Sequence, residues 1–444
     1  MVGRTPMLEV TQMDTGPCRL FLKLELMNPG GSIKDRIGIS MIEQAEKRGD
    51  IKPGDTLVEA TAGNTGLGLA LVAARKGYRL ILILPDKMSQ EKIFNLRAMG
   101  AQVVLTRSDV GRGHPEYYQD LGRAIADEKG AYFINQFGNP DNPLAHEETT
   151  APEILEQMDG DLDVIVLGVG SSGTVTGIGK YLAEHAPGVE LILADPVGSV
   201  LSDYINTGEL GTPGSWLVEG IGEDFIPDIA DFNQVTKAYA ISDAESFAVA
   251  RELLRSEGLL AGSSTGTLLA AALKYCREQT EAKRVVTFAC DTGNKYLSKL
   301  YNEFWMEDQG FIERERHGDL RDLIGRLHDE RATITVGPKD VLTTAHNRLR
   351  NAGFSQLPVM ENGELVGVVT EDTIIQFVYG HPDLMNAEVE EAMESAFIKL
   401  DKVDSVNNLV AMLRVQPYAA IMSGDEFLGL ITRSDVLNYL RRQI

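Results

Sequence analysis

Lys34 is the residue whose position in this sequence best suits an amine nucleophile. It follows Gly30 and Gly31, which allow a sharp turn with positive φ, and Ser32, a residue type that commonly caps a helix. The first turn of a helix disfavours a protonated amine because the helix dipole is positive there. A lysine that is also desolvated loses pKa and can bond covalently to a carbonyl cofactor. The alternative is a solvated loop lysine, and the stretch 28–36 alone leaves both open.

A second loop, residues 61–66, combines small hydroxyl and amide side chains with glycines. It comes directly after an apolar run at 56–60 and before a helical pattern at 67–76. Backbone N–H groups at the start of such a helix suit an anion, for example a substrate carboxylate. A capped helix with a polar turn explains the same residues, and the pattern does not separate the two.

A third loop, residues 168–174, reads Gly-Val-Gly-Ser-Ser-Gly-Thr and lies between a strand-like run and a helix. Its glycines and hydroxyls are suited to surrounding a phosphate with backbone N–H groups. Gly168, Gly170 and Gly173 also spell the dinucleotide-binding pattern GxGxxG, with Asp195 after the next strand. The loop therefore indicates a phosphate site, a dinucleotide site or, with no ligand, a tight turn.

The elements that would position these loops alternate between strand-like and helix-like segments. A strand-like segment at 20–26 is followed by apolar runs at 56–60, 79–84, 102–106, 164–167, 190–194 and 284–288. Helical patterns separate most of them, as at 89–99 and 181–185. This alternation predicts a largely parallel sheet with helices on both faces and ligands at the carboxyl ends of its strands. Three more small-residue loops, at 219–225, 258–266 and 291–294, follow the same arrangement.

The last part of the chain has a different character. Residues 306–330 form a charged connector, and then residues 357–370 match residues 418–432 as an internal repeat. Each copy contains a predicted hairpin and a closing helix, so the pair predicts one small domain. Asp435 follows Thr432 in the second copy, whereas Thr373 stands at the matching place in the first. The two copies therefore do not offer identical ligand sites.

Composition narrows the class of protein. The chain has 444 residues, enough for two or three domains, and a formal net charge of −23. That charge argues against nucleic acid or an anionic membrane as a partner, since both require a basic face. Three cysteines without CxxC spacing predict neither a disulfide framework nor a zinc site. No signal-peptide pattern is visible and no apolar run approaches the roughly 20 residues of a membrane span. We therefore expect a soluble cytoplasmic protein.

Together, these loops and the repeat resemble the pyridoxal-phosphate enzymes of the tryptophan-synthase-β type, and most closely the cystathionine β-synthase family. The resemblance runs over essentially the whole chain, and residues 142–151 look more like cystathionine synthases than cysteine synthases. It implies fold class α/β: a fold type II enzyme of two α/β subdomains with mostly parallel sheets, plus a C-terminal α+β tandem CBS (Bateman) module. The implied boundaries are a catalytic domain at 1–312, a linker at 313–330 and the CBS module at 331–444.

The resemblance also implies a cofactor, pyridoxal 5'-phosphate, bound covalently by Lys34. Asn64 would hydrogen-bond its phenolic oxygen, and Ser264 would place a hydroxyl at its pyridine nitrogen. Its phosphate would lie on Gly170, Ser171, Ser172, Gly173 and Thr174. The implied substrate-binding residues are Thr61, Ala62, Gly63, Thr65, Gln136, Gly220, Gly222 and Glu116, the last through the amino group of homocysteine. No metal and no haem are expected, since the haem-binding extension of the animal relatives is absent.

The implied reaction condenses L-serine with L-homocysteine to L-cystathionine and water, with hydrogen sulfide from cysteine as a side reaction. The nearest alternative is cysteine synthesis from O-acetylserine and sulfide. Two departures from the family pattern bear on substrate preference: Ala62 replaces the usual serine, and Glu223 replaces a tyrosine. An NAD-dependent dehydrogenase built on the 168–174 loop would leave Lys34 without a purpose.

For the CBS module the resemblance implies S-adenosylmethionine or another adenosyl ligand. Thr373, in place of the usual aspartate, weighs against a site in the first repeat. A structural module that only forms dimers is the alternative, and the sequence leaves both open. We expect a homodimer or homotetramer.

Overall fold

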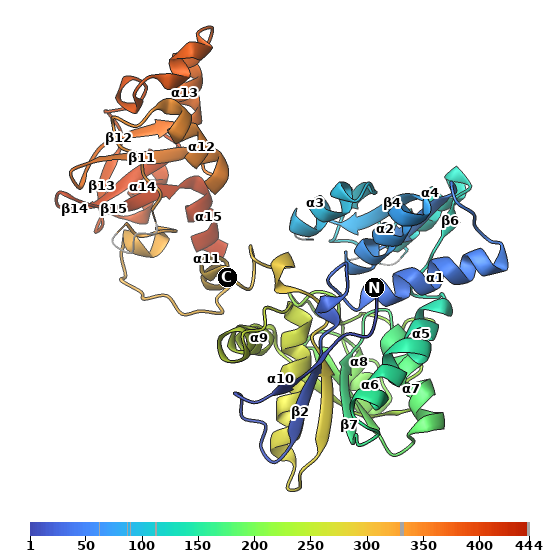
Figure 1. The fold of residues 1–444 in the computed structure, drawn as a ribbon. Helices are drawn as coiled ribbons and strands as arrows, with labels where there is room; N and C mark the ends of the chain where they lie inside the picture. The colour runs from blue at the N-terminus through green and yellow to red at the C-terminus, as the bar shows by residue number, and fades with distance from the viewer. Residues whose placement is uncertain (62, 87, 89, 112, 329–332, 442–444) are drawn as a thin grey trace. The chain divides into compact units, whose positions relative to one another are not determined.

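The structure, a computed structural model, describes residues 1–444 except 62, 87, 89, 112, 329–332 and 442–444. The chain forms two compact units, Met1–Asn302 and Glu303–Ile444 (Figure 1). The charged connector at 306–330, which includes the implied linker at 313–330, groups with the second unit. Among the described residues, no helix is both long enough and apolar enough to cross a membrane.

The first unit contains two separate sheets. The larger has the strand order β1-β2-β10-β7-β8-β9, and every pairing in it is parallel except that of β1 with β2. Its strands are β1 (Met7–Val10), β2 (Arg19–Lys23), β7 (Val164–Gly168), β8 (Glu190–Pro196), β9 (Val235–Ile241) and β10 (Arg284–Phe288). The smaller sheet is entirely parallel, with the order β5-β4-β3-β6. Its strands are β3 (Thr56–Ala60), β4 (Arg79–Pro85), β5 (Gln102–Thr106) and β6 (Tyr132–Phe133).

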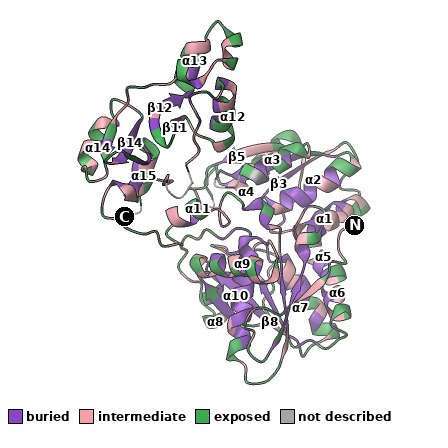
Figure 2. Ribbon diagram, turned by 60° about the vertical axis from the view of Figure 1, so that its left-hand side comes forward, coloured by how far each residue is buried: buried purple, intermediate pink, exposed green. Residues whose placement is uncertain are grey.

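Helices cover these sheets, and the prediction of two α/β subdomains is confirmed. They are α1 (Lys34–Arg48), α2 (Asn64–Lys76), α3 (Gln90–Ala98), α4 (Tyr118–Lys129), α5 (Asp141–Ala145), α6 (Ala151–Gln157), α7 (Gly173–His185), α8 (Leu201–Thr207), α9 (Asp243–Glu257) and α10 (Ser263–Glu278). A π-helical segment, His146–Thr150, joins α5 to α6. Figure 2 shows buried residues concentrated along the strands and α10, as a parallel sheet covered by helices requires.

The second unit confirms the predicted repeat. In the first copy, β11 (Gln356–Glu361) and β12 (Glu364–Thr370) form a hairpin, followed by α13 (Glu371–Val378). In the second, β14 (Tyr418–Ser423) and β15 (Glu426–Thr432) do the same, followed by α15 (Arg433–Arg441). The remaining elements are α11 (Glu303–Asp308), α12 (Leu342–Ala352), β13 (Lys399–Asp401) and α14 (Val406–Met412). Both hairpins carry a register shift at the equivalent place, so the copies match in detail.

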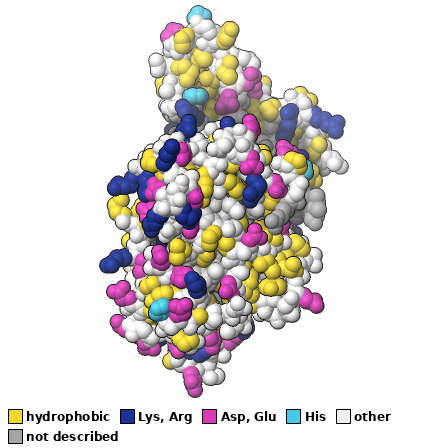
Figure 3. Space-filling model, turned by 90° about the vertical axis from the view of Figure 1, so that its right-hand side faces the viewer, with side chains coloured by type: hydrophobic (Ala, Val, Ile, Leu, Met, Phe, Trp, Pro, Cys, Tyr) yellow, Lys and Arg dark blue, Asp and Glu magenta, His cyan; other side chains and the backbone are white. Residues whose placement is uncertain are grey.

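The surface agrees with the composition. The face shown in Figure 3 carries acidic and basic side chains interspersed among hydrophobic ones, without a continuous basic area. The mixture on this face agrees with a sequence that contains 65 acidic and 42 basic residues.

Candidate active site

A cavity of about 490 Å³ in the first unit brings together loops from both sheets. Most of the residues predicted for the site line it: Lys34, Thr61, Gly63, Asn64, Thr65, Gln136, Gly170, Ser171, Ser172, Thr174, Gly220, Gly222 and Ser264. The loops lie at the carboxyl ends of β3, β7 and β10, where parallel sheets place their ligands. Segments more than 200 residues apart in the chain thus form one site.

Lys34 is the first residue of α1 and faces this cavity. Burial lowers the pKa of its amine, and the nearby groups Cys290 and Glu223 partly oppose that shift. The predicted N-cap is wrong in one respect: Ile33, not Ser32, precedes the first helical residue. The backbone of Ser32 instead forms a bridge to Asp291, and its hydroxyl accepts from the N–H of Lys34 at 3.3 Å.

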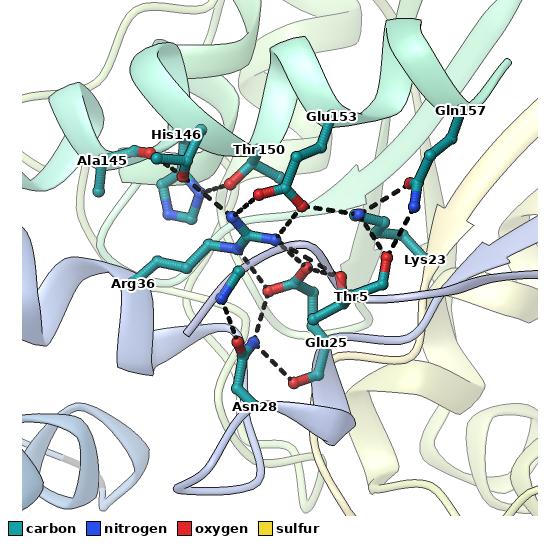
Figure 4. A network of polar contacts seen from close by, with 12 residues as sticks. Thr5, Lys23, Glu25, Asn28, Arg36, Ala145, His146, Thr150, Glu153 and Gln157 are labelled. Carbon is teal, nitrogen blue, oxygen red and sulfur yellow. Dashed lines mark hydrogen bonds and ion pairs between the residues drawn. The ribbon is translucent and has the colours of Figure 1, made fainter. Parts of the chain in front are cut away.

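A buried ion network holds the first turn of α1 in place (Figure 4). Arg36 donates from Nε and one terminal nitrogen to the two carboxylate oxygens of Glu25, both at 2.8 Å. Its terminal nitrogens also donate to Glu153 of α6 at 2.8 and 2.7 Å. Lys23 joins through Glu153 at 2.8 Å, and Asn28 donates to Glu25 at 2.9 Å. The network fixes Lys34, two residues before Arg36, because it ties that turn to β2 and α6.

The loop at 61–66 closes one side of the cavity. Gly63 takes a φ of +121°, a conformation that residues with side chains rarely adopt, and α2 begins at the next residue. Thr65 donates to Gln136 Oε1 at 2.7 Å, which joins two of the predicted substrate residues. Ala62 lies outside the described residues.

The loop at 168–174 forms a cradle with polar groups that suit an anion. Ser172 has a φ of +69° and lies just before α7, and its buried hydroxyl has no hydrogen-bond partner in the part of the chain described. The side-chain nitrogen of Asn142 donates to the Ser171 hydroxyl at 2.9 Å. The buried Oδ1 of Asn142 has no hydrogen-bond partner among the described residues. Thr174 meets His146 Nε2 at 3.3 Å. A cradle of hydroxyls and N–H groups at a helix start, with an orphaned hydroxyl, fits a phosphate.

Gly173 and Ser264 complete the predicted cofactor set. Gly173 heads α7 and packs so closely on Asn142 that a Cβ would overlap its Oδ1, which explains the glycine although it does not line the cavity. Ser264 is buried in the first turn of α10 and faces the cavity beside Cys290. Burial raises the pKa of the Cys290 thiol to about 12, so this cysteine is protonated at neutral pH.

Glu116, the residue predicted to meet the second substrate, lies elsewhere. Its side chain is 55% exposed, 3.7 Å from Arg107, and it does not line the described part of the cavity. Glu223 does line the cavity. The Ser199 hydroxyl accepts from the backbone N–H of Glu223 and donates to its carbonyl oxygen, both at 3.1 Å.

Several residues of the site were not identified from sequence. Lys92 of α3 is 1% exposed and donates to Glu219 at 2.5 Å, while Lys299 reaches the other oxygen of Glu219 at 2.6 Å. The hydrocarbon chain of Lys92 lies beneath Gly63, since a Cβ there would be 2.8 Å from Lys92 Cδ. Both lysines were isolated in the sequence and carried no spacing signal.

The dinucleotide interpretation meets an obstacle at Asp195. This carboxylate is fully buried at the end of β8, and its Oδ2 accepts from the N–H of Ser202 at 2.8 Å. Burial raises the pKa of Asp195 to about 6, although hydrogen bonds from the serines nearby oppose the shift. Asp195 therefore anchors α8 and does not line the cavity. In a dinucleotide site this carboxylate would have to reach the ribose of the ligand.

The described residues also contain no cluster of three or more potential metal ligands.

Comparison with known proteins identifies the family. The profile described as "Pyridoxal-phosphate dependent enzyme" matches residues 1–291, and the one described as "CBS domain" matches residues 324–380. A cystathionine beta-synthase of Oryctolagus cuniculus is 36% identical over 463 residues, covering 99% of this chain and 84% of the relative. One from Dictyostelium discoideum is 34% identical over 456 residues, with 99% and 91% covered. The chain belongs to the cystathionine beta-synthase family of pyridoxal-phosphate dependent enzymes.

Solved structures extend this family assignment. The O-acetylserine dependent cystathionine beta-synthase of Helicobacter pylori is 39% identical, with a TM-score of 0.62 over 67% of this chain and 95% of that chain. A hydrogen sulfide-producing enzyme of Fusobacterium nucleatum is 36% identical, with a TM-score of 0.62 over 67% of this chain and 97% of that chain. Members of the cystathionine beta-synthase family thus share this fold, and the chain is an enzyme of the β-replacement type.

Pyridoxal phosphate is the cofactor of this family, and the residues present fit it. The orphaned Ser172 hydroxyl and its neighbours fit the phosphate, and the desolvated Lys34 amine fits the aldehyde. When bound, pyridoxal phosphate withdraws electrons from the α-carbon of an amino acid. With the cofactor bound, Lys34 would be the residue that can hold and release a proton there, because burial lowers the pKa of its amine. His146, whose pKa burial lowers far below its usual value, stays neutral while it positions Thr174.

Proposed function

We propose that this enzyme condenses L-serine with L-homocysteine to give L-cystathionine and water. The observation that carries the proposal is that Lys34, with its pKa lowered by burial, faces the same cavity as the 61–66 loop and the 168–174 cradle. With pyridoxal phosphate and serine bound, the Lys34 amine would take the α-proton at Nζ. The 61–66 loop binds the substrate carboxylate through its N–H groups. The β-hydroxyl then leaves as water, with the proton that the homocysteine thiol gives up, and the thiolate adds to the β-carbon. Lys34 Nζ returns its proton to the α-carbon, so that cystathionine and water are the products.

Relatives support serine and homocysteine as the substrates. Proteins named cystathionine beta-synthase match almost the whole chain at 33–38% identity. Glu223 offers a carboxylate inside the cavity, where it could receive the ammonium group of an amino-acid thiol. Sulfide carries no such group, so Glu223 favours homocysteine over sulfide as the second substrate.

The second candidate is cysteine synthesis from O-acetylserine and sulfide. A structure named O-acetylserine dependent cystathionine beta-synthase in Helicobacter pylori is 39% identical to this chain, and its name supports only the O-acetylserine part of this candidate. One named hydrogen sulfide-producing enzyme in Fusobacterium nucleatum is 36% identical. The first proposal, cystathionine synthesis, includes a side reaction: when cysteine takes the place of serine, hydrogen sulfide is released.

Steady-state kinetics decide between the two. We expect kcat/KM for serine with homocysteine to exceed kcat/KM for O-acetylserine with sulfide, with Lys34→Ala as the inactive control. The reverse order would assign cysteine synthesis instead. Replacing homocysteine by a thiol without an amino group, in wild type and in Glu223→Gln, tests the part given to Glu223.

We further propose that the second unit binds one adenosyl ligand. A cavity of about 510 Å³ within it is lined by Thr432, Asp435, Phe304, Phe354 and Arg326. Asp435 accepts from the N–H and hydroxyl of Thr432 at 2.7 and 2.5 Å. The guanidinium carbon of Arg326 lies 4.6 Å from the ring centres of both Phe304 and Phe354. A carboxylate for ribose hydroxyls and a stacked arginine-aromatic group suit a nucleoside.

The first repeat differs at the equivalent place. There, Thr373 and Thr370 cap each other, each N–H donating to the other's hydroxyl at 3.0 Å. A ribose would find no carboxylate at that position, which supports one site in place of two. Calorimetric titration with S-adenosylmethionine is expected to give heat for the wild type and for Thr373→Ala, and none for Asp435→Asn. No heat in the wild type would favour the structural role, and light scattering would then test the predicted homodimer or homotetramer.

A further inference from the structure

Lys295 is a buried lysine of the active-site region that the reaction as described does not use. It ends a short 3-10 segment, Gly293–Lys295, which follows β10 after residues 289–292, and it is 4% exposed. Its ammonium donates to the carbonyl oxygens of Gly30 and Gly31 at 2.9 and 3.2 Å. It also donates to Asn64 Oδ1 at 2.9 Å. One cation therefore joins the glycine turn that precedes Lys34 to the residue that opens α2.

The amide of Asn64 lies between two groups of opposite charge. Its oxygen faces the Lys295 ammonium, while its Nδ2 donates to Asp291 Oδ2 at 2.7 Å. The same oxygen of Asp291 accepts from the hydroxyl of Tyr296 at 2.7 Å. A flipped amide would set its oxygen against the carboxylate and its NH2 against the ammonium, and both contacts would be repulsive. The orientation of Asn64 is thus fixed, and one N–H of its NH2 group remains for an oxygen in the cavity.

The chemistry of pyridoxal phosphate indicates which oxygen that is. The aldehyde carbon of the cofactor is flanked by the phosphate arm and by the phenolic oxygen. The phosphate cradle comes from the loop after β7 of the larger sheet, whereas Asn64 comes from the loop after β3 of the smaller sheet. Lys34, the amine for the aldehyde, lines the same cavity. The Asn64 amide is therefore the donor suited to the phenolic oxygen.

We propose that Lys295 and Asp291 are positioning residues that orient and polarise the Asn64 amide, and thereby set the ionisation of the cofactor's phenolic oxygen. A cation at the amide oxygen draws electrons from the NH2 group and strengthens its remaining N–H as a donor. A stronger donor favours the phenolate, and so favours the proton on the nitrogen that Lys34 contributes. This inference rests on pyridoxal phosphate as cofactor and is independent of which substrates the enzyme uses.

The charges around Lys295 set the pH range in which this effect operates. Burial lowers the pKa of Lys295 to about 8; Asp291 and Asp35 oppose the shift, and Lys92 adds to it. Tyr296 is the other titratable group bonded to Asp291, and burial raises its pKa well above the usual range, so it stays protonated. Loss of a proton from Lys295 removes the positive charge at Asn64 Oδ1.

The absorption spectrum of the resting holoenzyme tests the proposal without any substrate. The ratio of the long-wavelength band to the short-wavelength band reports the ionisation of the phenolic oxygen. In the wild type we expect this ratio to fall as pH rises, with a midpoint near the Lys295 pKa of about 8. Lys295→Met should lower the ratio at neutral pH about tenfold, the loss of one charge-assisted hydrogen bond, and abolish the transition. Lys295→Arg should keep the high ratio and move the midpoint upward.

The matched control is Lys274→Met, the same change at a lysine of α10 that pairs with Glu245 outside the cavity. It should leave the spectrum and the midpoint as in the wild type. A Lys295→Met holoenzyme with the wild-type ratio and midpoint would overturn the proposal. If circular dichroism shows that Lys295→Met does not fold, the wild type and Lys295→Arg decide the matter, because equal midpoints in the two would overturn it as well.

Discussion

Gly38 of α1 and Gly68 of α2 bring the backbones of their helices into direct contact. A Cβ on Gly38 would lie 2.6 Å from the carbonyl carbon of Gly68, and a Cβ on Gly68 would lie 2.6 Å from the carbonyl oxygen of Lys34. Lys34 opens α1 and Asn64 opens α2, so this glycine pair sets the separation of two residues that line the cavity. The position of the proposed catalytic lysine thus depends on two residues that carry no functional group.

Substitution of Gly68 tests this dependence. Gly68→Ala should push α1 and α2 apart and destabilise the protein by about 1–3 kcal/mol, more than the helix propensity of alanine returns. It should also weaken cofactor binding, measured by the apparent Kd of the apoenzyme for pyridoxal phosphate. Gly179→Ala in α7 is the control, since its nearest Cβ contact is an ordinary 3.4 Å. Equal behaviour of the two variants would contradict the role of the contact.

The buried Arg36 network makes a second prediction. Arg36→Met leaves Glu25, whose side chain is fully buried, without its cation, and this should cost about 3–5 kcal/mol in the free energy of unfolding. The first turn of α1 should loosen as well, so that the amine of Lys34 reacts more slowly with added pyridoxal phosphate.

Arg19→Met is the matched control for Arg36→Met. Arg19 pairs with Glu9 at the same distance of 2.8 Å, but the two side chains are 58% and 35% exposed. Exposed ion pairs contribute little, so this variant should unfold in urea like the wild type. A loss for Arg19→Met that matches the loss for Arg36→Met would show that burial is not the deciding factor.

The acid limit of stability should depend on Glu153. Burial raises the pKa of this carboxyl, but hydrogen bonds from Arg36, from the backbone of Arg4 and from Lys23 outweigh burial and bring it to about 2. Because the folded-state pKa lies below the usual value of 4.5, the ionised Glu153 stabilises the folded protein. This contribution is complete above pH 4.5 and is lost as pH falls towards 2. With its side chain only 14% exposed, Glu153 should contribute about 3 kcal/mol of this acid dependence.

Urea unfolding at a series of pH values measures that contribution. Glu153→Gln should flatten the slope of the unfolding free energy against pH in this acid range, whatever its effect at neutral pH. Glu9→Gln, at the exposed pair with Arg19, should leave the slope nearly unchanged. A Glu153→Gln slope equal to that of the wild type would refute the assignment.

The fold was predictable where burial is complete. The bounds of β3 and β10 agree with the apolar runs at 56–60 and 284–288, because strands covered on both faces are continuously apolar. The bounds of β5 agree with the run at 102–106 as well, although this edge strand is buried only at Thr106. β1 and β9 were not predicted. Both are edge strands, and their exposed sides carry polar residues, so neither forms a continuous apolar run.

The site was predictable where its residues lie in a loop that follows a strand. Lys34, Asn64 and the cradle at 168–174 were found in this way, and they line one cavity. Lys295 and Lys92 were not found, because their roles arise from contacts between distant segments: Lys295 lies 231 residues from Asn64, and Lys92 lies 127 from Glu219. An isolated lysine has no spacing that distinguishes it from a surface lysine before the fold brings it to its partner.

The ion pair of Lys92 with Glu219 should determine how well the substrate binds. Lys92 lies beneath Gly63 and bonds to Glu219 at 2.5 Å, so it holds α3 and the 61–66 loop against the segment that leads to Gly220. Lys299 bonds to the other oxygen of the same carboxylate, so Glu219 is held from two sides. Lys92→Met should raise KM for serine about tenfold and change kcat by less than about twofold.

Lys274→Met is the control, because Lys274 is an ion-paired lysine outside the cavity, and this variant should leave both constants unchanged. A fall in kcat with KM unchanged would mean that Lys92 acts on the chemical step and not on binding.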